Sequence, residues 1–203
     1  MGRTSNADQR MMDAAIFLLW GESYGSVTVD DICRKADVRK GSFYYFFDSK
    51  SDLAVKALGR MWQNYRSQLE EMFAPNLPPI ERIQNYCHNT YAMQADMREE
   101  HGRVLGCVLC ALGSEIGSRD DAIRDKIRSL MEDIRSFWVQ AIADGQAEGI
   151  IPAGDVALKV RCTMAFFEGL VAQARLHNDL SRIADLADQV CLHLRVNERV
   201  AAA

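Results

Sequence analysis

A cluster of basic residues stands out in the first quarter of the chain. It comprises Arg34, Lys35, Arg39, Lys40 and Lys50, with Asp37 and Asp48 as the only acids between them. Lys and Arg neutralise phosphates, but five cations can hold only a few of them. The cluster therefore indicates a small patch for a phosphate backbone.

The distribution of charge along the chain favours the same interpretation. Residues 1–60 carry nine Lys and Arg against eight Asp and Glu, whereas the rest of the chain carries 15 against 20, within a formal net charge of −4. A basic excess confined to the start of an acidic protein argues against a surface that binds nucleic acid all round.

Six cysteines offer a second candidate chemistry, and Cys107 and Cys110 form the one C-x2-C pair. A structural zinc site usually needs four ligands, and a spacing of three merely places two thiols on one face of a helix. We therefore expect no metal and no cofactor. A thiol-dependent enzyme or redox protein is the alternative, but the pair has no His or acid at motif spacing, so we expect no enzymatic activity.

Long helices must position these residues. Hydrophobic residues make up 48% of the 203, and only four Pro and 13 Gly interrupt stretches rich in good helix formers. The sequence therefore predicts an all-α protein with a packed core. Helical periodicity predicts nine helices, at residues 5–24, 29–36, 40–46, 50–73, 79–100, 103–116, 119–147, 155–178 and 181–197.

Capping patterns mark several of these helix starts. In a capping box, a Ser or Thr side chain bonds the backbone three residues on, and an acid there returns the bond. Ser5, Thr28, Ser49 and Ser118 are each followed three residues later by Asp. The Ala-rich end at 200–203 is expected to be disordered.

The segment around the basic cluster has the pattern of two short helices joined by a tight turn. Val29, Ile32 and Cys33 give the first helix one buried face. Asp37 opens the turn, and Asp tolerates the left-handed backbone that such a turn can require. The second helix begins at Lys40 and carries a glycine, a hydroxyl and two tyrosines, a surface suited to a DNA groove.

The five aromatic residues at 43–47 allow another interpretation, in which they form only a core cluster. Successive side chains on a helix are about 100° apart, so five in a row cannot all face inward. We expect Phe43 and Phe47 to pack in the core, and Tyr44, Tyr45 and Lys50 to face DNA.

Two strings of residues carry a family resemblance. Gly25–Ile32 reads G-x-x-T-V-x-x-I, and Ala36–Lys50 reads A-x-V-x-x-G-x-F-Y-Y-x-F-x-x-K. In these strings residues 6–60 resemble the DNA-binding domain of the TetR family of transcriptional regulators. Asp37 departs from the family, which usually has Gly there, and Phe46 stands where His or Tyr is frequent. The resemblance implies phosphate contacts by Thr28, Ser42, Tyr45 and Lys50, and base contacts by Arg39, Lys40, Gly41 and Tyr44.

The resemblance also implies a division of the chain. Residues 1–50 would form a three-helix helix-turn-helix DNA-binding domain, and residues 51–203 a larger helical ligand-binding and dimerisation domain, with the helix 50–73 as connector. The last two predicted helices are amphipathic, and Ala165, Gly169 and Ala172 would allow close packing in a homodimer. Alternatively, these helices only close the core of one subunit. The expected interface residues are Val156, Val160, Phe167, Leu170, Ile183, Leu186, Val190 and Leu194.

The helices of the larger domain are expected to frame a pocket for a small-molecule effector, although aromatic residues at helical spacing are more often core than ligand contacts. His88 and Arg103 are the expected polar anchors. The candidates are Trp62, Tyr65, Tyr86, His88, Tyr91, Arg103, Cys107, Cys110, Phe137, Trp138, Phe166 and Phe167.

Gly106 and Cys107 begin a string similar to that of one TetR subgroup, in which the cysteine can sense electrophiles or oxidants. Arg103, one helical turn earlier, would favour the thiolate. The alternative is that Cys107 only packs in the core.

These observations predict a cytoplasmic, homodimeric repressor, released from a palindromic double-stranded operator by a small-molecule effector or by modification of Cys107. The longest charge-free apolar run, residues 104–114, is too short to span a bilayer, so no membrane partner is expected. A DNA-bound architectural protein without a ligand pocket is the remaining alternative.

Overall fold

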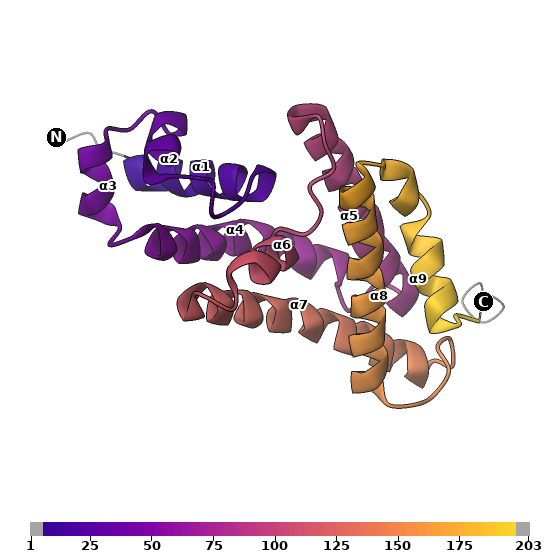
Figure 1. Ribbon diagram of the computed structural model, residues 1–203. Helices are drawn as coiled ribbons and strands as arrows, with labels where there is room; N and C mark the ends of the chain where they lie inside the picture. The colour runs from indigo at the N-terminus through magenta and orange to yellow at the C-terminus, as the bar shows by residue number, and fades with distance from the viewer. Residues whose placement is uncertain (1–5, 198–203) are drawn as a thin grey trace. The chain divides into compact units, whose positions relative to one another are not determined.

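The computed structural model describes residues 6–197, which form nine α-helices and one 3₁₀ helix (Figure 1). No strand occurs in this part of the chain, so the predicted all-α class is confirmed. The helices are α1 Ala7–Gly21, α2 Val29–Lys35, α3 Lys40–Phe46, α4 Lys50–Met72, α5 Pro79–His101, α6 Val108–Ile116, α7 Asp121–Ala147, α8 Val156–His177, the 3₁₀ helix η1 Leu180–Ile183 and α9 Leu186–Leu194.

These helices group into two compact units. The first comprises Met1–Arg66 and Val108–Leu130, and the second comprises Ser67–Cys107 and Met131–Ala203. α4 and α7 each contribute residues to both units. The units differ from the predicted division at residue 50, because α6 and the start of α7 group with the N-terminal helices.

The first unit is built around α1, which contacts α2, α3 and α6. Its buried residues Met11, Ala15 and Leu19 recur every four positions, so they form one apolar stripe. Ile32 of α2 and Phe43 of α3 are fully buried in the same unit. The helix-turn-helix is therefore held on a hydrophobic core rather than by its loops.

In the second unit α9 contacts α5 and α8. α5 begins with Pro79 at its first position, as the sequence predicts, since proline needs no backbone donor there. Arg82 is buried in this unit, and its guanidinium donates to the carbonyls of Leu77 and Pro75 and to Asp144. A buried charge is tolerated when it is paired with an opposite charge and hydrogen-bonded, as here.

Several predicted helix boundaries were wrong, and the first helix, predicted to end at 24, ends at Gly21. The helix predicted at 103–116 begins at Val108, because residues 102–107 form a loop that side chains of other helices hold. The helix predicted from 119 begins at Asp121, where Asp120 rather than Ser118 accepts a backbone N–H, that of Ile123. The helix predicted at 181–197 is divided into η1 and α9.

The structure confirms the predicted capping patterns only in part. Thr28 makes the complete capping box with Asp31. At Ser49 only half of the box forms, since Ser49 accepts from the Asp52 backbone while Asp52 bonds to Asp48. Ser5 and the Ala-rich end at 200–203 lie outside the described residues.

Candidate nucleic-acid interface and ligand-binding core

The turn between α2 and α3 has the backbone that the sequence predicts. Asp37 adopts φ 52°, the left-handed region. The amide of Val38 donates to the carbonyl of Cys33 at 2.9 Å, and Arg10 of α1 donates to the Asp37 carbonyl at 3.3 Å. Aspartate therefore takes here the conformation that usually favours glycine.

Thr28 fixes the start of α2. Its hydroxyl donates to the Asp31 carboxylate at 2.6 Å and accepts the Asp31 amide at 3.2 Å. The hydrogen bonds from Thr28 hold the pKa of Asp31 below its usual value. The predicted phosphate contact by Thr28 thus concerns a hydroxyl that already caps a helix.

α3 divides its aromatic residues between core and surface, as their spacing predicts. Phe43 and Phe47 are buried, whereas Tyr44 and Tyr45 are 63% and 83% exposed. A large aromatic side chain left in water is unusual unless a partner covers it. Arg39 and Gly41 are also exposed, and Ser42 is half-buried.

Lys40 is exposed at the start of α3 and pairs with Asp30 of α2 at 2.9 Å. The hydrogen bond to Asp30 raises the pKa of Lys40, so the side chain is charged at neutral pH. An exposed ion pair contributes little, typically about 0–1 kcal/mol, so exchanging Asp30 for a phosphate costs little.

Lys50 does not point its ammonium group into solvent. Its Nζ donates to the carbonyls of Tyr24 and Val27 at 2.7 and 2.8 Å, and lies 4.1 Å from the centre of the Tyr24 ring. Partial burial lowers the pKa of Lys50, while the nearby carboxylate of Glu115 opposes that shift. The sequence predicted a phosphate contact, but in this structure Lys50 holds the loop between α1 and α2.

The same loop is held from α6 by Glu115, a residue that the sequence analysis missed. The two carboxylate oxygens of Glu115 accept the amides of Tyr24 and Gly25 at 2.8 and 2.9 Å. Because Glu115 lies 91 residues from Tyr24 in the chain, no local pattern could reveal this contact.

In the second unit the structure brings together four of the predicted pocket residues: Tyr86, Phe137, Trp138 and Phe167. Phe73, which the sequence analysis missed, joins their rings. Neighbouring ring centroids in this aromatic cluster are 5.3–6.2 Å apart, so the rings are in contact.

Other predicted pocket residues lie elsewhere. His88 and Arg103 are exposed, so they do not act as polar anchors in the core, and Tyr91 is half-buried. The ring of Phe166 stacks on that of His193 of α9, with centroids 4.7 Å apart. Trp62, Tyr65 and Cys110 belong to the first unit.

Cys107 ends a loop whose backbone is held by hydrogen bonds to Gln94, Arg175 and Asn178. Gln94 accepts the amides of Leu105 and Gly106, and Arg175 donates to the Leu105 carbonyl at 2.9 Å. Gly106 has φ 69°, and the Arg175 side chain packs where a Cβ would lie. Since residues 102–107 are not helical, Arg103 is not one helical turn before Cys107, and Arg175 is the cation that reaches this loop.

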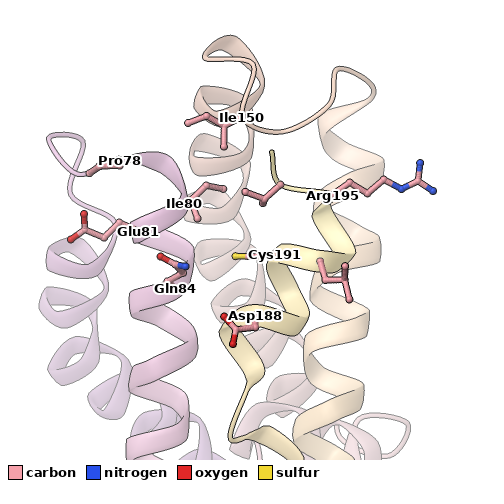
Figure 2. A pocket seen from close by; sticks show the side chains of 10 residues that line it. Pro78, Ile80, Glu81, Gln84, Ile150, Asp188, Cys191 and Arg195 are labelled. Carbon is pink, nitrogen blue, oxygen red and sulfur yellow. The ribbon is translucent and has the colours of Figure 1, made fainter. Parts of the chain in front are cut away.

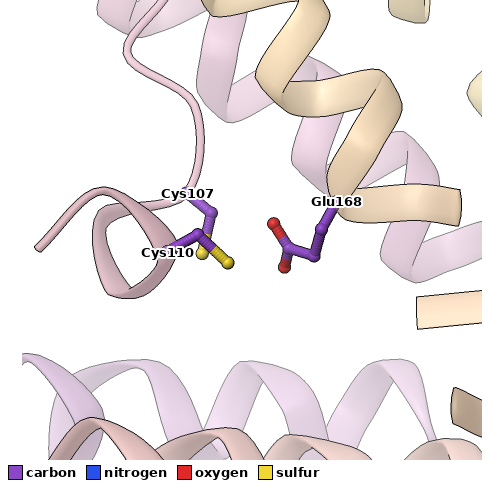
Figure 3. A group of neighbouring side chains, drawn as sticks. All are labelled: Cys107, Cys110 and Glu168. Carbon is purple, nitrogen blue, oxygen red and sulfur yellow. The ribbon is translucent and has the colours of Figure 1, made fainter. Parts of the chain in front are cut away.

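Figure 3 shows Cys107 near Glu168 of α8. The Cys107 sulfur lies within 4.8 Å of a Glu168 carboxylate oxygen. A neighbouring negative charge disfavours a thiolate, so this contact opposes the activation that the sequence analysis expected.

A groove of about 640 Å³ opens between α5 and α9 (Figure 2). Cys191 points from α9 toward α5 in this groove, and Arg195 points away from it. None of the predicted pocket residues lines the groove. Its lining residues are Pro78, Ile80, Glu81, Gln84, Ile150, Asp188, Cys191, Leu192, Arg195 and Val196.

Most residues predicted for the dimer interface are buried within one subunit. They cannot add surface to a partner contact, because they expose almost none: Val160, Phe167, Ile183, Leu186, Val190 and Leu194 are each at most 4% exposed. Val156 and Leu170 are half-buried. A different face of α8 is open to solvent, with Leu158, Cys162, Ala165, Gly169, Ala172 and Leu176 at helical spacing.

A short helix with an exposed basic and aromatic face, held by a capped helix and a tight turn, defines a helix-turn-helix protein. The family model described as bacterial regulatory proteins, tetR family, matches residues 11–57, and that of the tetracyclin repressor-like C-terminal domain matches residues 79–190. The chain belongs to the TetR family of DNA-binding transcriptional regulators. None of the described helices is long and apolar enough to cross a membrane.

The chain is similar to known regulators over most of its length. It is 28% identical over 174 residues to the transcriptional regulator AcuR of Cereibacter sphaeroides, covering 85% of this chain and 78% of that protein. It is 23% identical over 150 residues to the transcriptional repressor NemR of Escherichia coli strain K12, covering 73% of each. A regulatory protein TetR from Rhodobacter sphaeroides has a similar crystal structure, with a TM-score of 0.81 and 26% identity over 93% of this chain and 99% of that one.

Proposed function

We propose that this protein is a cytoplasmic homodimeric repressor that binds a palindromic operator and leaves it when a small molecule binds. The observation that carries the proposal is the exposed face of α3, where Arg39, Gly41, Tyr44 and Tyr45 stand in solvent on a rigid support. A helix of this kind enters a major groove and reads base edges. One such helix makes few contacts, so two copies are needed for specificity.

The open face of α8 supports the dimer. Leu158 and Leu176 at its ends are 46% and 74% exposed, and a Cβ built on Gly169 at its middle meets nothing within 4 Å. A second copy that packed its own α8 there would cover this apolar stripe, with the small central residues allowing close approach.

Gly169→Glu tests the dimer without disturbing the fold of one subunit, because the new side chain has room. In a dimer the carboxylate would be buried without a partner, which costs several kcal/mol. Sedimentation should therefore give a monomer that no longer binds operator. Ala157→Glu, exposed on the same helix but off the stripe, is the matched control, and dimers of both variants would refute the interface.

Selection of bound duplexes from a random pool tests the DNA interface. We expect an affinity of roughly 10⁻⁸ to 10⁻¹¹ M for a short palindrome at physiological salt. Tyr44→Ala should change the preferred bases, whereas Tyr45→Ala should weaken all sequences alike. Identical preferences for wild type and Tyr44→Ala would show that Tyr44 does not read bases.

Release follows if the effector binds the DNA-incompetent state better than the DNA-competent one, since only that difference can shift the equilibrium. Modification of Cys107 is a second route, supported by the half-buried thiol at the end of a tightly held loop and by the similarity to NemR. Operator affinity before and after N-ethylmaleimide, in wild type and Cys107→Ser, decides between them. Loss of binding that persists in Cys107→Ser would exclude this thiol.

A further inference from the structure

Two polar atoms in the core of the second unit have no hydrogen-bond partner among the described residues. They are Nε1 of Trp138 on α7 and Oγ1 of Thr163 on α8. Both side chains are 0% exposed. Native proteins pair nearly all buried polar groups, so each exception needs an explanation.

The other buried polar side chains of this unit do have partners. Arg82 donates to two carbonyls and to Asp144, Gln94 bonds three groups of the loop before α6, and Thr90 donates to the Tyr86 carbonyl at 2.9 Å. The lack of a partner therefore distinguishes Trp138 and Thr163 from their surroundings.

Trp138 belongs to the aromatic cluster, and Thr163 shares a helix face with another member of it, Phe167. The Trp138 indole meets the rings of Tyr86 and Phe167 edge to face, with centroids 5.5 and 5.9 Å apart. Thr163 lies four residues before Phe167 on α8, and both are buried, so they share a helix face. The cluster thus combines a broad apolar surface with two unused polar groups, the composition typical of a small-molecule site.

We propose that Trp138 and Thr163 are the polar contacts of a small uncharged ligand that carries a carbonyl oxygen. An indole N–H can only donate, so the ligand must accept, and the Thr163 hydroxyl can supply a second donor. The ring surfaces hold an apolar body. This inference rests on the proposed function, because the ligand would be the effector.

Charge in the surrounding residues favours an uncharged molecule. The three donors of Arg82 that the structure assigns are all used within the protein, and Glu168, next to Phe167, would repel an anion. A buried ion without a counter-charge is far more costly than a buried carbonyl. The groove between α5 and α9 is the weaker candidate, because its charged residues Glu81, Asp188 and Arg195 are exposed to water.

Binding at this cluster has a structural consequence. Because the rings are in contact, a ligand reaches Trp138 only by separating residues of α5, α7 and α8. α7 continues into the first unit, so displacement of its second half is transmitted to that unit through one continuous helix.

Thr163→Val separates this proposal from a purely structural role, since valine has the same shape without the hydroxyl. Removing an unpartnered buried hydroxyl should leave the melting temperature unchanged or raise it by about 2 °C, whereas removing a paired one should lower it. Thr90→Val is the matched control, because Thr90 is buried in the same unit with its hydrogen bond made. Thr90→Val should lower the melting temperature and leave ligand binding intact.

The probes are acetophenone and cyclohexanone, with ethylbenzene as an analogue lacking the acceptor and benzoate as a charged one. In a ¹H–¹⁵N spectrum, the Trp138 Nε1–H resonance, assigned from its loss in Trp138→Phe, should move downfield with the ketones alone. Thr163→Val should bind the ketones at least tenfold more weakly. A lower melting temperature in Thr163→Val, or no shift of this resonance by either ketone at millimolar concentration, would overturn the proposal.

Operator binding in the same samples distinguishes the two proposals. Ketones that shift the Trp138 resonance without weakening operator binding support this site and contradict its role as the effector site. A molecule that releases the operator without moving the resonance supports the effector-released repressor and contradicts this site.

Discussion

The loop between α1 and α2 in the first unit and the region of Trp138 and Thr163 in the second differ in how their polar groups are paired. In the first, the loop between α1 and α2 has four backbone groups paired by two side chains: Glu115 accepts two amides, and Lys50 donates to two carbonyls. In the second, the indole N–H of Trp138 and the hydroxyl of Thr163 have no partner among the described residues.

The difference follows from what each region has to do. A recognition helix must hold one geometry to read bases, and paired polar groups fix that geometry. A ligand site must instead leave polar groups unpaired for the ligand, which lowers the stability of the ligand-free protein. The pairing in the α1–α2 loop and the lack of partners at Trp138 and Thr163 therefore both follow from the cost of an unpaired polar group.

The largest effect should come from breaking a pair within the second unit. Arg82→Met would leave two carbonyls and Asp144 without their donor, and we expect a loss of about 2–4 kcal/mol in the free energy of unfolding. The value is below that of a fully buried pair, because Asp144 is 31% exposed and keeps its bond from Gln140. Chemical denaturation of Arg82→Met and of Thr163→Val compares the loss of a paired polar group with the loss of an unpaired one. Equal destabilisation of the two variants would contradict this difference in pairing.

Glu115→Ala should have a smaller effect on stability and a clear one on DNA binding. It removes two charge-assisted hydrogen bonds, but the groups are exposed, so we expect about 1–2 kcal/mol. Operator affinity should fall by tenfold or more, because the loop before α2 is no longer fixed. Glu115→Gln keeps one acceptor and should lie between.

If thermal melting and operator affinity of Glu115→Ala both match wild type, the carboxylate does not hold the loop in solution. If stability falls and operator affinity stays, the loop does not position α3.

Local physics made much of the fold predictable. Helical periodicity and the Thr28 capping pattern located α2 and α3 to within one residue. The 100° step between side chains separated buried Phe43 from exposed Tyr44. These features depend on residues no more than a turn apart.

Contacts between distant parts of the chain were not predictable in this way. The apolar run before Cys110 has a helical composition, yet Gln94 and Arg175 hold its first residues as a loop. α8 is apolar on two faces, so periodicity could not tell which face turns inward. This is why Phe167, which is buried, was assigned to the interface together with Ala165, Gly169 and Ala172, which lie on the open stripe.

The smallest expected change, and a sharp test of the first unit, concerns Lys50. A lysine that contacts a DNA phosphate contributes about 0.9 to the slope of the logarithm of affinity against the logarithm of salt concentration. The Lys50 ammonium is instead bonded to the carbonyls of Tyr24 and Val27, so Lys50→Met should weaken operator binding while leaving this slope unchanged. Lys40→Met, which removes an exposed ammonium at the expected DNA interface, is the matched control and should make the slope shallower.

The comparison of slopes separates positioning from contact even if both variants bind weakly, because the slope does not depend on the affinity itself. Equal slopes for wild type and Lys50→Met, with a shallower one for Lys40→Met, would support the interpretation that Lys50 holds the α1–α2 loop and does not contact DNA. A slope reduced by about one in Lys50→Met would mean that the side chain leaves its two carbonyls when DNA binds and takes a phosphate instead. In that case Lys50 would exchange its two carbonyl partners for a DNA phosphate on binding. Its ammonium group, like the polar groups of Trp138 and Thr163, would then serve to bind an external partner.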